Sequence, residues 1–209
     1  EVECAMKDYL PRWFTDYVYQ LYTDKCKLKH SDPVYYNLQK AKLNSLYGMC
    51  VQKYLRDTYI EDYDTGEYKL EPITDHEDAY NRHINKWTTI LPYFWGVWVT
   101  AYAFEHLFEL GKCAGDWVYS DTDSCYGANW DTEKLNAYNE KCKEKLLANG
   151  YGAVEFDGEK YWLGVAEFDG SYSEFITCGA KRYACRYSDD PRNDKDKIGT
   201  LKITVAGVP

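Results

Sequence analysis

The order of local patterns constrains the fold most, because helix-forming and hairpin-forming segments alternate along this chain. Apolar residues recur with helical spacing after Pro11, a residue that suits the first turn of a helix. Short apolar runs flank turn signals such as Asp64-Thr65-Gly66 and Asp169-Gly170, which favour antiparallel hairpins. The expected helices are residues 11–30, 33–48, 97–110 and 132–149, and the expected hairpins are residues 57–72, 117–126 and 161–187. This order predicts an α+β fold.

The expected elements group into three parts. Ser31-Asp32-Pro33 interrupts the first helical segment, so residues 11–30 and 33–48 should fold back on each other as a helical hairpin. Gly48 is the expected end of the second helix. A small β-hairpin at 57–72 is expected within an insert, and the antiparallel sheet and its packed helices follow it. The three parts are residues 1–50, 51–91 and 92–209.

The charge distribution bears on whether the chain can hold nucleic acid. Its 209 residues carry a formal net charge of -9, which opposes binding to phosphate. However, residues 57–78 alone contain nine acidic residues and one lysine, so the rest of the chain is close to neutral. Basic side chains gather in a different stretch, at Lys25, Lys27, Lys29, Lys40 and Lys42. Local charge decides where phosphate can dock, so a nucleic-acid-binding function is not excluded.

Several other classes are excluded by simple patterns. No run approaches the 18 apolar residues of a membrane-spanning helix, and the first residues, EVECAMKDYL, do not resemble a signal peptide. The eight cysteines contain no C-x2-4-C pair, so a zinc ribbon or finger is not expected, and reduced thiols are. These features predict a cytoplasmic protein with no membrane partner.

The first motif that could carry chemistry is Lys40-Ala-Lys-Leu-Asn44-Ser45-Leu-Tyr47-Gly48. On a helix, Lys40, Asn44 and Tyr47 fall on one face and present an ammonium, an amide and a phenol in one row. An ammonium suits a triphosphate, and a flat ring next to a glycine can lie under a sugar or base. An ordinary amphipathic helix with a solvated lysine explains the same residues.

The second motif is Tyr119-Ser-Asp121-Thr122-Asp123-Ser124. Two carboxylates one residue apart, at a tight turn between short apolar strands, should point into the same small volume. Like charges at this spacing resist joint ionisation unless a cation lies between them, and carboxylate oxygens suit Mg²⁺. The alternative is an Asx turn with solvated aspartates.

The third motif, Gly179-Ala-Lys181-Arg182-Tyr183, is expected within a strand. Strand alternation would send Lys181 and Tyr183 to one face and Arg182 to the other. An amine beside an aromatic ring fits a sugar-phosphate backbone. An exposed lysine on an edge strand would produce the same pattern.

The order and spacing of these three motifs resemble a known family. K-x-x-x-N-S-x-Y-G, then Y-x-D-T-D-S, then K-x-Y is similar to motif B, motif C and the K-x-Y motif of family B DNA polymerases. Pro92-Tyr-Phe-Trp-Gly96 and Thr100-Ala-Tyr-Ala103 resemble the segment before motif C. The insert with its hairpin at 57–72 is similar to the second terminal-protein-region insertion of the protein-primed viral branch. The resemblance implies a helical-hairpin fingers element, an insert and the C-terminal half of an antiparallel palm.

The resemblance also implies roles for individual residues and their ligands. The reaction would be template-directed transfer of a dNMP to a primer 3′-hydroxyl, with two Mg²⁺ (or Mn²⁺) ions in a complete site. The implied partners are primer-template DNA, dNTP and, for that branch, a terminal protein primer, inside a bacterium or a phage-infected host cell. The implied catalytic and metal-binding residues are Asp121 and Asp123; the nucleotide-binding residues are Lys25, Lys29, Lys40, Asn44 and Tyr47; the DNA-binding residues are Ser45, Gly48, Thr122, Lys181, Arg182 and Tyr183.

Two departures from the family pattern limit what is implied. Phe104 stands where family members usually carry an arginine, and the motif A pattern D-x-x-S-L-Y-P, with its metal-binding aspartate, is absent. The chain is therefore expected to be a fragment of a longer enzyme that is inactive by itself. Two other functions stay open: a non-catalytic nucleic-acid-binding module, and another palm-type nucleotidyltransferase. The module would not explain the paired aspartates, and the second would not need the Lys40–Gly48 helix.

Overall fold

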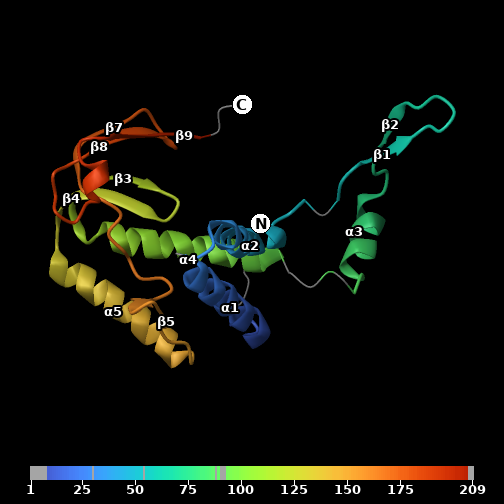
Figure 1. The fold of residues 1–209 in the computed structure, drawn as a ribbon. Coiled ribbons are helices and arrows are strands. Elements are labelled where there is room, and N and C mark those ends of the chain that lie inside the picture. The colour runs from blue at the N-terminus through green and yellow to red at the C-terminus, as the bar shows by residue number, and fades with distance from the viewer. Residues whose placement is uncertain (1–8, 30, 54, 88, 90–92, 207–209) are drawn as a thin grey trace. The chain divides into compact units, whose positions relative to one another are not determined.

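The computed structural model describes residues 9–29, 31–53, 55–87, 89 and 93–206, and the chain forms two compact units within them. Helices and small antiparallel sheets both occur, which confirms the expected α+β fold (Figure 1). The first unit combines residues 1–103 with 153–161, and the second combines 104–152 with 162–209. The expected parts were 1–50, 51–91 and 92–209. The first unit joins the first two of these parts and also includes residues 92–103 and 153–161 of the third.

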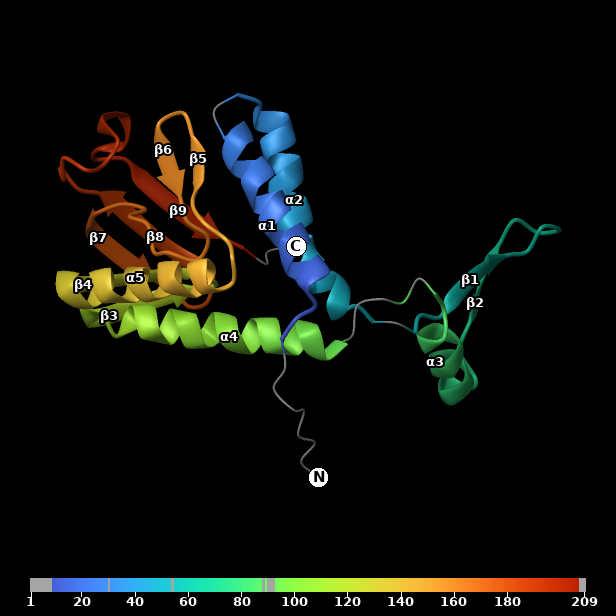
Figure 2. The same ribbon diagram turned by 90° about the horizontal axis from the view of Figure 1, so that it is seen from below.

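Two antiparallel helices, α1 (Arg12–Leu28) and α2 (Pro33–Cys50), form the expected helical hairpin of the first unit (Figure 2). The Asp32 carboxylate caps α2 by accepting from the backbone N–H groups of Val34 and Tyr35 at 3.0 and 3.1 Å. The expected end of α2 at Gly48 is wrong, because the helix continues to Cys50. Gly48 keeps a negative φ, so it does not adopt the left-handed cap conformation that ends many helices.

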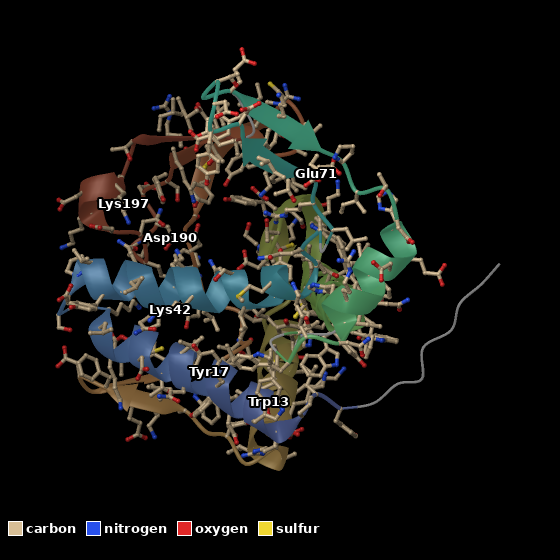
Figure 3. All side chains as sticks on the ribbon, turned by 90° about the vertical axis from the view of Figure 1, so that its right-hand side faces the viewer. Trp13, Tyr17, Lys42, Glu71, Asp190 and Lys197 are labelled. Atoms are coloured by element: carbon tan, nitrogen blue, oxygen red, sulfur yellow. The ribbon has the colours of Figure 1, made fainter. Side chains whose placement is uncertain are left out.

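The insert is a β-hairpin followed by a short helix. Strands β1 (Thr58–Glu61) and β2 (Tyr68–Glu71) pair antiparallel, which confirms the hairpin expected at 57–72, and all of their residues are exposed. Figure 3 labels Glu71, the last residue of β2. The helix α3 (His76–Ile84) follows and was not expected. Asp75 caps it, and two acidic residues in its first turn stabilise the helix because they lie at the positive end of its dipole.

A small hairpin from later in the sequence completes the first unit. Strands β5 (Val154–Phe156) and β6 (Glu159–Tyr161) are joined by Asp157-Gly158, which both have positive φ, as a type I′ turn requires. Val154 and Tyr161 are buried, and β5 packs against α1. No hairpin was expected here. Residues 153–161 were assigned to the third part of the chain and instead belong to the first unit.

In the second unit, a long β-hairpin and a three-stranded sheet lie beside two helices. The end of α4 (Tyr93–Gly111) leads into β3 (Ala114–Asp121) and β4 (Ser124–Trp130), and α5 (Thr132–Ala148) follows. The antiparallel sheet has the order β7 (Tyr172–Thr177), β8 (Arg182–Tyr187), β9 (Leu201–Val205), with a 3-10 turn at Lys195–Lys197 before β9. Figure 1 shows β3 and β4 next to this sheet.

The hairpin expected around Asp169-Gly170 is wrong, because β7 instead pairs with β8 across residues 178–181. Residues 162–171 find other partners. The Asn139 side chain on α5 bonds both the N–H and the carbonyl of Ala166, at 2.8 and 3.2 Å. The buried Asn193 side chain likewise bonds both backbone groups of Ser171. Two side-chain amides therefore satisfy backbone groups that a strand partner would otherwise satisfy.

The described residues contain seven of the eight cysteines, and all seven are free thiols, as expected. Cys4 and Pro92 of the sequence motifs lie outside the described residues. Within the described part of the chain, no helix combines the length and the apolar character that crossing a membrane requires.

Candidate active site at the Asp121–Asp123 turn

The two aspartates of the second motif lie at the tip of the β3–β4 hairpin. Asp121 pairs with Ser124, so Thr122 and Asp123 form a two-residue loop. Thr122 has φ +59°, a conformation that is unusual for a β-branched residue and that the tight loop requires. Its hydroxyl donates to Asp121 Oδ1 at 3.0 Å, and the Ser124 hydroxyl donates to the Asp121 carbonyl at 3.0 Å. The hydroxyl residues of the motif therefore hold the turn that places the carboxylates.

Lys181 of the third motif reaches this turn from a distant part of the sequence. Its Nζ lies 2.9 Å from Asp121 Oδ1 and 3.1 Å from Thr122 Oγ1, although about 60 residues separate the two motifs. The expectation that Lys181 lies in a strand is wrong. It occupies the turn before β8, with φ +56°, because the chain reverses direction there.

The ion pair sets the local electrostatics. The hydrogen bond from Lys181 lowers the pKa of Asp121, and the Thr122 hydroxyl lowers it further. The same hydrogen bond to Asp121 also raises the pKa of Lys181. Both groups are therefore charged at neutral pH. The lysine neutralises one of the two adjacent carboxylates, which relieves the repulsion that their spacing would otherwise produce.

Asp123 is the free carboxylate of the pair. It is exposed, and it makes neither a hydrogen bond nor an ion pair with any described residue. Among the described residues, no group of three or more His, Cys, Asp or Glu side chains could hold a metal ion. Mg²⁺ commonly binds one or two carboxylates and completes its coordination with water and phosphate oxygens. Asp123, with Asp121 beside it, fits such an incomplete site.

Aromatic rings lie beneath the turn and join β3–β4 to the three-stranded sheet. The Tyr119 ring lies 5.9 Å from that of Tyr126, 5.6 Å from Phe175 and 5.2 Å from Tyr183. The Tyr126 hydroxyl donates to the Tyr183 hydroxyl at 3.0 Å. We call these four residues the tyrosine cluster.

The cluster changes the interpretation of the third motif. Tyr183 is buried in it, whereas Arg182 is exposed on the opposite face of β8. Lys181 is therefore the residue of the motif that can reach a ligand, and Tyr183 packs beneath the turn. Sequence reasoning missed Tyr126 and Phe175 as parts of the site. The sequence pattern that could have indicated them is the alternation of aromatic residues in short strands. That pattern does not reveal which strands pair with each other.

The residues of the first motif lie on α2, in the first unit. Lys40, Asn44 and Tyr47 are exposed and fall on one face, as helical spacing predicts. Ser45 is exposed, and its hydroxyl donates to the carbonyl of Lys42 in the same helix, at 3.1 Å. Figure 3 labels Lys42 on α2. This face is free to bind a ligand, and its position relative to the Asp121–Asp123 turn stays a prediction.

Lys25 on α1 and Lys29, the residue directly after α1, both have aromatic partners. Lys25 Nζ lies 5.5 Å from the ring centroid of Tyr22, one turn earlier on α1, and Lys29 Nζ lies 4.7 Å from that of Tyr161 at the end of β6. Cation–π contacts of this length orient an ammonium without neutralising it. The first unit therefore holds both lysines near tyrosine rings.

Comparisons with protein-family models, with curated proteins and with solved structures gave no significant match for this chain.

Proposed function

We propose that this chain is the fingers and C-terminal palm portion of a family B DNA polymerase. The observation that carries the proposal is the ion pair between Lys181 and Asp121, at 2.9 Å. The K-x-Y lysine and the Asp-Thr-Asp turn were identified separately in the sequence, and nothing in either motif requires them to touch. Their contact supports a single site in which a cation and a carboxylate pair serve one ligand.

In this proposal the turn contributes part of a divalent-cation site. Asp123 would hold Mg²⁺ or Mn²⁺, with Asp121 beside it. A metal in such a site lowers the pKa of the attacking hydroxyl and stabilises charge on the transferred phosphate. Lys181 would contact a phosphate of the primer strand near the turn. The exposed face of Lys40, Asn44 and Tyr47 would bind the incoming dNTP, as the resemblance implies.

The experiment compares variants of the 209-residue chain in two binding assays. Mn²⁺ binding is followed by electron paramagnetic resonance, and primer-template binding by filter-binding titration at several salt concentrations. Asp123→Asn should abolish Mn²⁺ binding, because an amide oxygen is a much weaker ligand for a hard cation than a carboxylate. Lys181→Ala should weaken DNA binding for all sequences and flatten the salt slope by about one unit, the loss of one phosphate contact.

Lys197→Ala is the matched control, because Lys197 is an exposed lysine of the same unit and its side chain pairs with Asp194, away from the Asp121–Asp123 turn. It should leave both measurements unchanged. Loss of DNA binding in Lys181→Ala without any Mn²⁺ site at Asp123 would instead support the non-catalytic nucleic-acid-binding module. Normal DNA binding by Lys181→Ala would overturn the proposed contact.

A further inference from the structure

We propose that Tyr119 is a positioning residue that holds Lys181 against the Asp121–Thr122 edge of the turn. Sequence reasoning assigned no role to this tyrosine. The inference rests on the proposed function for its consequence, DNA binding, but its structural part can be tested independently. The ligand concerned is the sugar-phosphate backbone of the primer strand, bound through the Lys181 ammonium.

The backbone N–H and the backbone carbonyl of Lys181 each form a hydrogen bond with a residue outside its own turn. Its backbone N–H donates to the Tyr119 hydroxyl at 2.8 Å, although 62 residues separate the two. Its carbonyl accepts from the N–H of Ala206, just after β9, at 3.0 Å. One hydrogen bond comes from the β3–β4 hairpin and the other from the edge of the three-stranded sheet. The backbone of Lys181 is therefore held from two sides.

The conformation held in this way is one that a lysine seldom adopts. At φ +56°, Lys181 lies in the left-handed region, where a residue with a Cβ is strained and a glycine is not. Such a conformation persists only where the surrounding structure enforces it, and it is common at functional sites. Here the enforced backbone directs the side chain so that Nζ reaches Asp121 and Thr122 together.

Tyr119 is itself held firmly enough to act as the enforcing group. Its ring packs in the tyrosine cluster against three other aromatic rings. The pairing of β3 with β4 shifts register between Trp117 and Tyr119, and such an irregularity commonly re-aims the adjacent side chain. Tyr119 also precedes Asp121 by two residues on the same strand. One strand therefore supplies both the acceptor for the Lys181 backbone and the carboxylate for its side chain.

The test removes only the hydroxyl, with Tyr119→Phe, and measures Lys181 directly. The amide hydrogen exchange and the ¹⁵N shift of Lys181 are recorded by NMR on the 209-residue chain. Loss of the acceptor should accelerate exchange of this amide by about tenfold and shift its resonance. The matched control is Tyr172→Phe, because the Tyr172 hydroxyl bonds Asp169 and Lys202 rather than Lys181. The control should leave the Lys181 amide unchanged.

The second measurement is a double-mutant cycle on primer-template affinity. Tyr119→Phe should raise Kd by about three- to tenfold, the usual range for one neutral hydrogen bond. In the Lys181→Ala background it should produce no additional loss, because its effect passes through the lysine. A merely structural role would instead give the same loss in both backgrounds.

The outcomes separate the inference from the proposed function. An unchanged Lys181 amide in Tyr119→Phe, or an equal loss of affinity in both backgrounds, overturns the positioning role. If Lys181→Ala binds DNA normally, the proposed function fails, and the amide measurement alone then decides whether Tyr119 holds the turn.

Discussion

At the scale of single residues, Gly111 marks a close approach between a helix and a ring. A Cβ built on this glycine, the last residue of α4, would lie 2.6 Å from two carbons of the Trp117 indole. The indole cannot simply swing away, because its Nε1–H donates to Ser120 Oγ at 2.7 Å and its edge contacts the Phe108 ring. Gly48 on α2 is different, because a Cβ there would meet no heavy atom within 4 Å.

We therefore expect opposite effects from the same substitution at these two glycines. Gly111→Ala should lower the free energy of unfolding by about 1–3 kcal/mol, the usual cost of overpacking. Gly48→Ala should raise it by up to about 1 kcal/mol, because alanine favours an α-helix over glycine. Urea denaturation of both variants measures the difference. A stabilised Gly111→Ala would show that the contact with Trp117 is relaxed in solution.

At the scale of elements, the β3–β4 hairpin and the three-stranded sheet meet through tyrosine rings. Burial raises the pKa of Tyr126 well above the ordinary range, and its hydrogen bond to Tyr183 raises it further. Burial and a hydrogen bond to Tyr187 raise the pKa of Tyr172 in the same direction. On α5, burial raises the pKa of Tyr138 to about 12. The packing of these elements thus depends on neutral phenols.

This dependence predicts a loss of stability in alkali. A phenol whose pKa is raised by folding stabilises the folded state fully below the unfolded pKa of about 10, and this contribution is lost as the pH rises through the folded pKa. The free energy of unfolding should therefore fall from about pH 10 upward. Denaturant titrations across this range measure it, with phenolate absorbance as the second signal. Tyr126→Phe should make the fall shallower, because it removes one of the phenols whose pKa folding raises. The substitution leaves the buried cysteine thiols unchanged.

The elements also show how much of the structure could be predicted from the sequence. Helices were predictable where local signals set their ends, as Asp32 and Pro33 do for α2. The β7–β8 turn was not, because beside Gly179 it also needs a positive φ at Lys181, a residue type that turn rules do not favour. In the site, Asp121 and Lys181 were each identified from their motifs. Their contact could not be derived, since it depends on how strands about 60 residues apart are arranged.

At the scale of the whole molecule, the chain passes between its two units more than once. Helix α4 contributes to both units, and the β5–β6 hairpin belongs with α1 although it follows α5 in the sequence. Contiguous boundaries drawn from the order of elements and motifs therefore could not reproduce the units. The motifs are divided in the same way. The Lys40–Gly48 face lies in the first unit, and the Asp121–Lys181 pair lies in the second.

This division, together with the carboxylates available, leads to the last prediction. The 209-residue chain should not extend a primer at a measurable rate with Mg²⁺ or Mn²⁺. The turn offers only Asp123 as a free carboxylate beside the paired Asp121, and the described residues hold no group of three potential metal ligands. Two-metal transfer depends on carboxylates that bridge both ions, and positioning and charge stabilisation supply most of its rate. Single-turnover extension of a labelled primer measures the activity.

Under the proposed function, the informative comparison would be with a longer chain from the same reading frame in which a D-x-x-S-L-Y-P segment is found upstream. That chain should extend the primer, and Asp123→Asn within it should abolish extension while primer-template affinity stays close to its original value. The substitution preserves shape and removes a negative ligand, so it affects the cation more than the DNA. Robust extension by the 209-residue chain alone would mean that another carboxylate completes the site. If the longer Asp123→Asn chain extends the primer at the original rate, Asp123 has no role in the reaction.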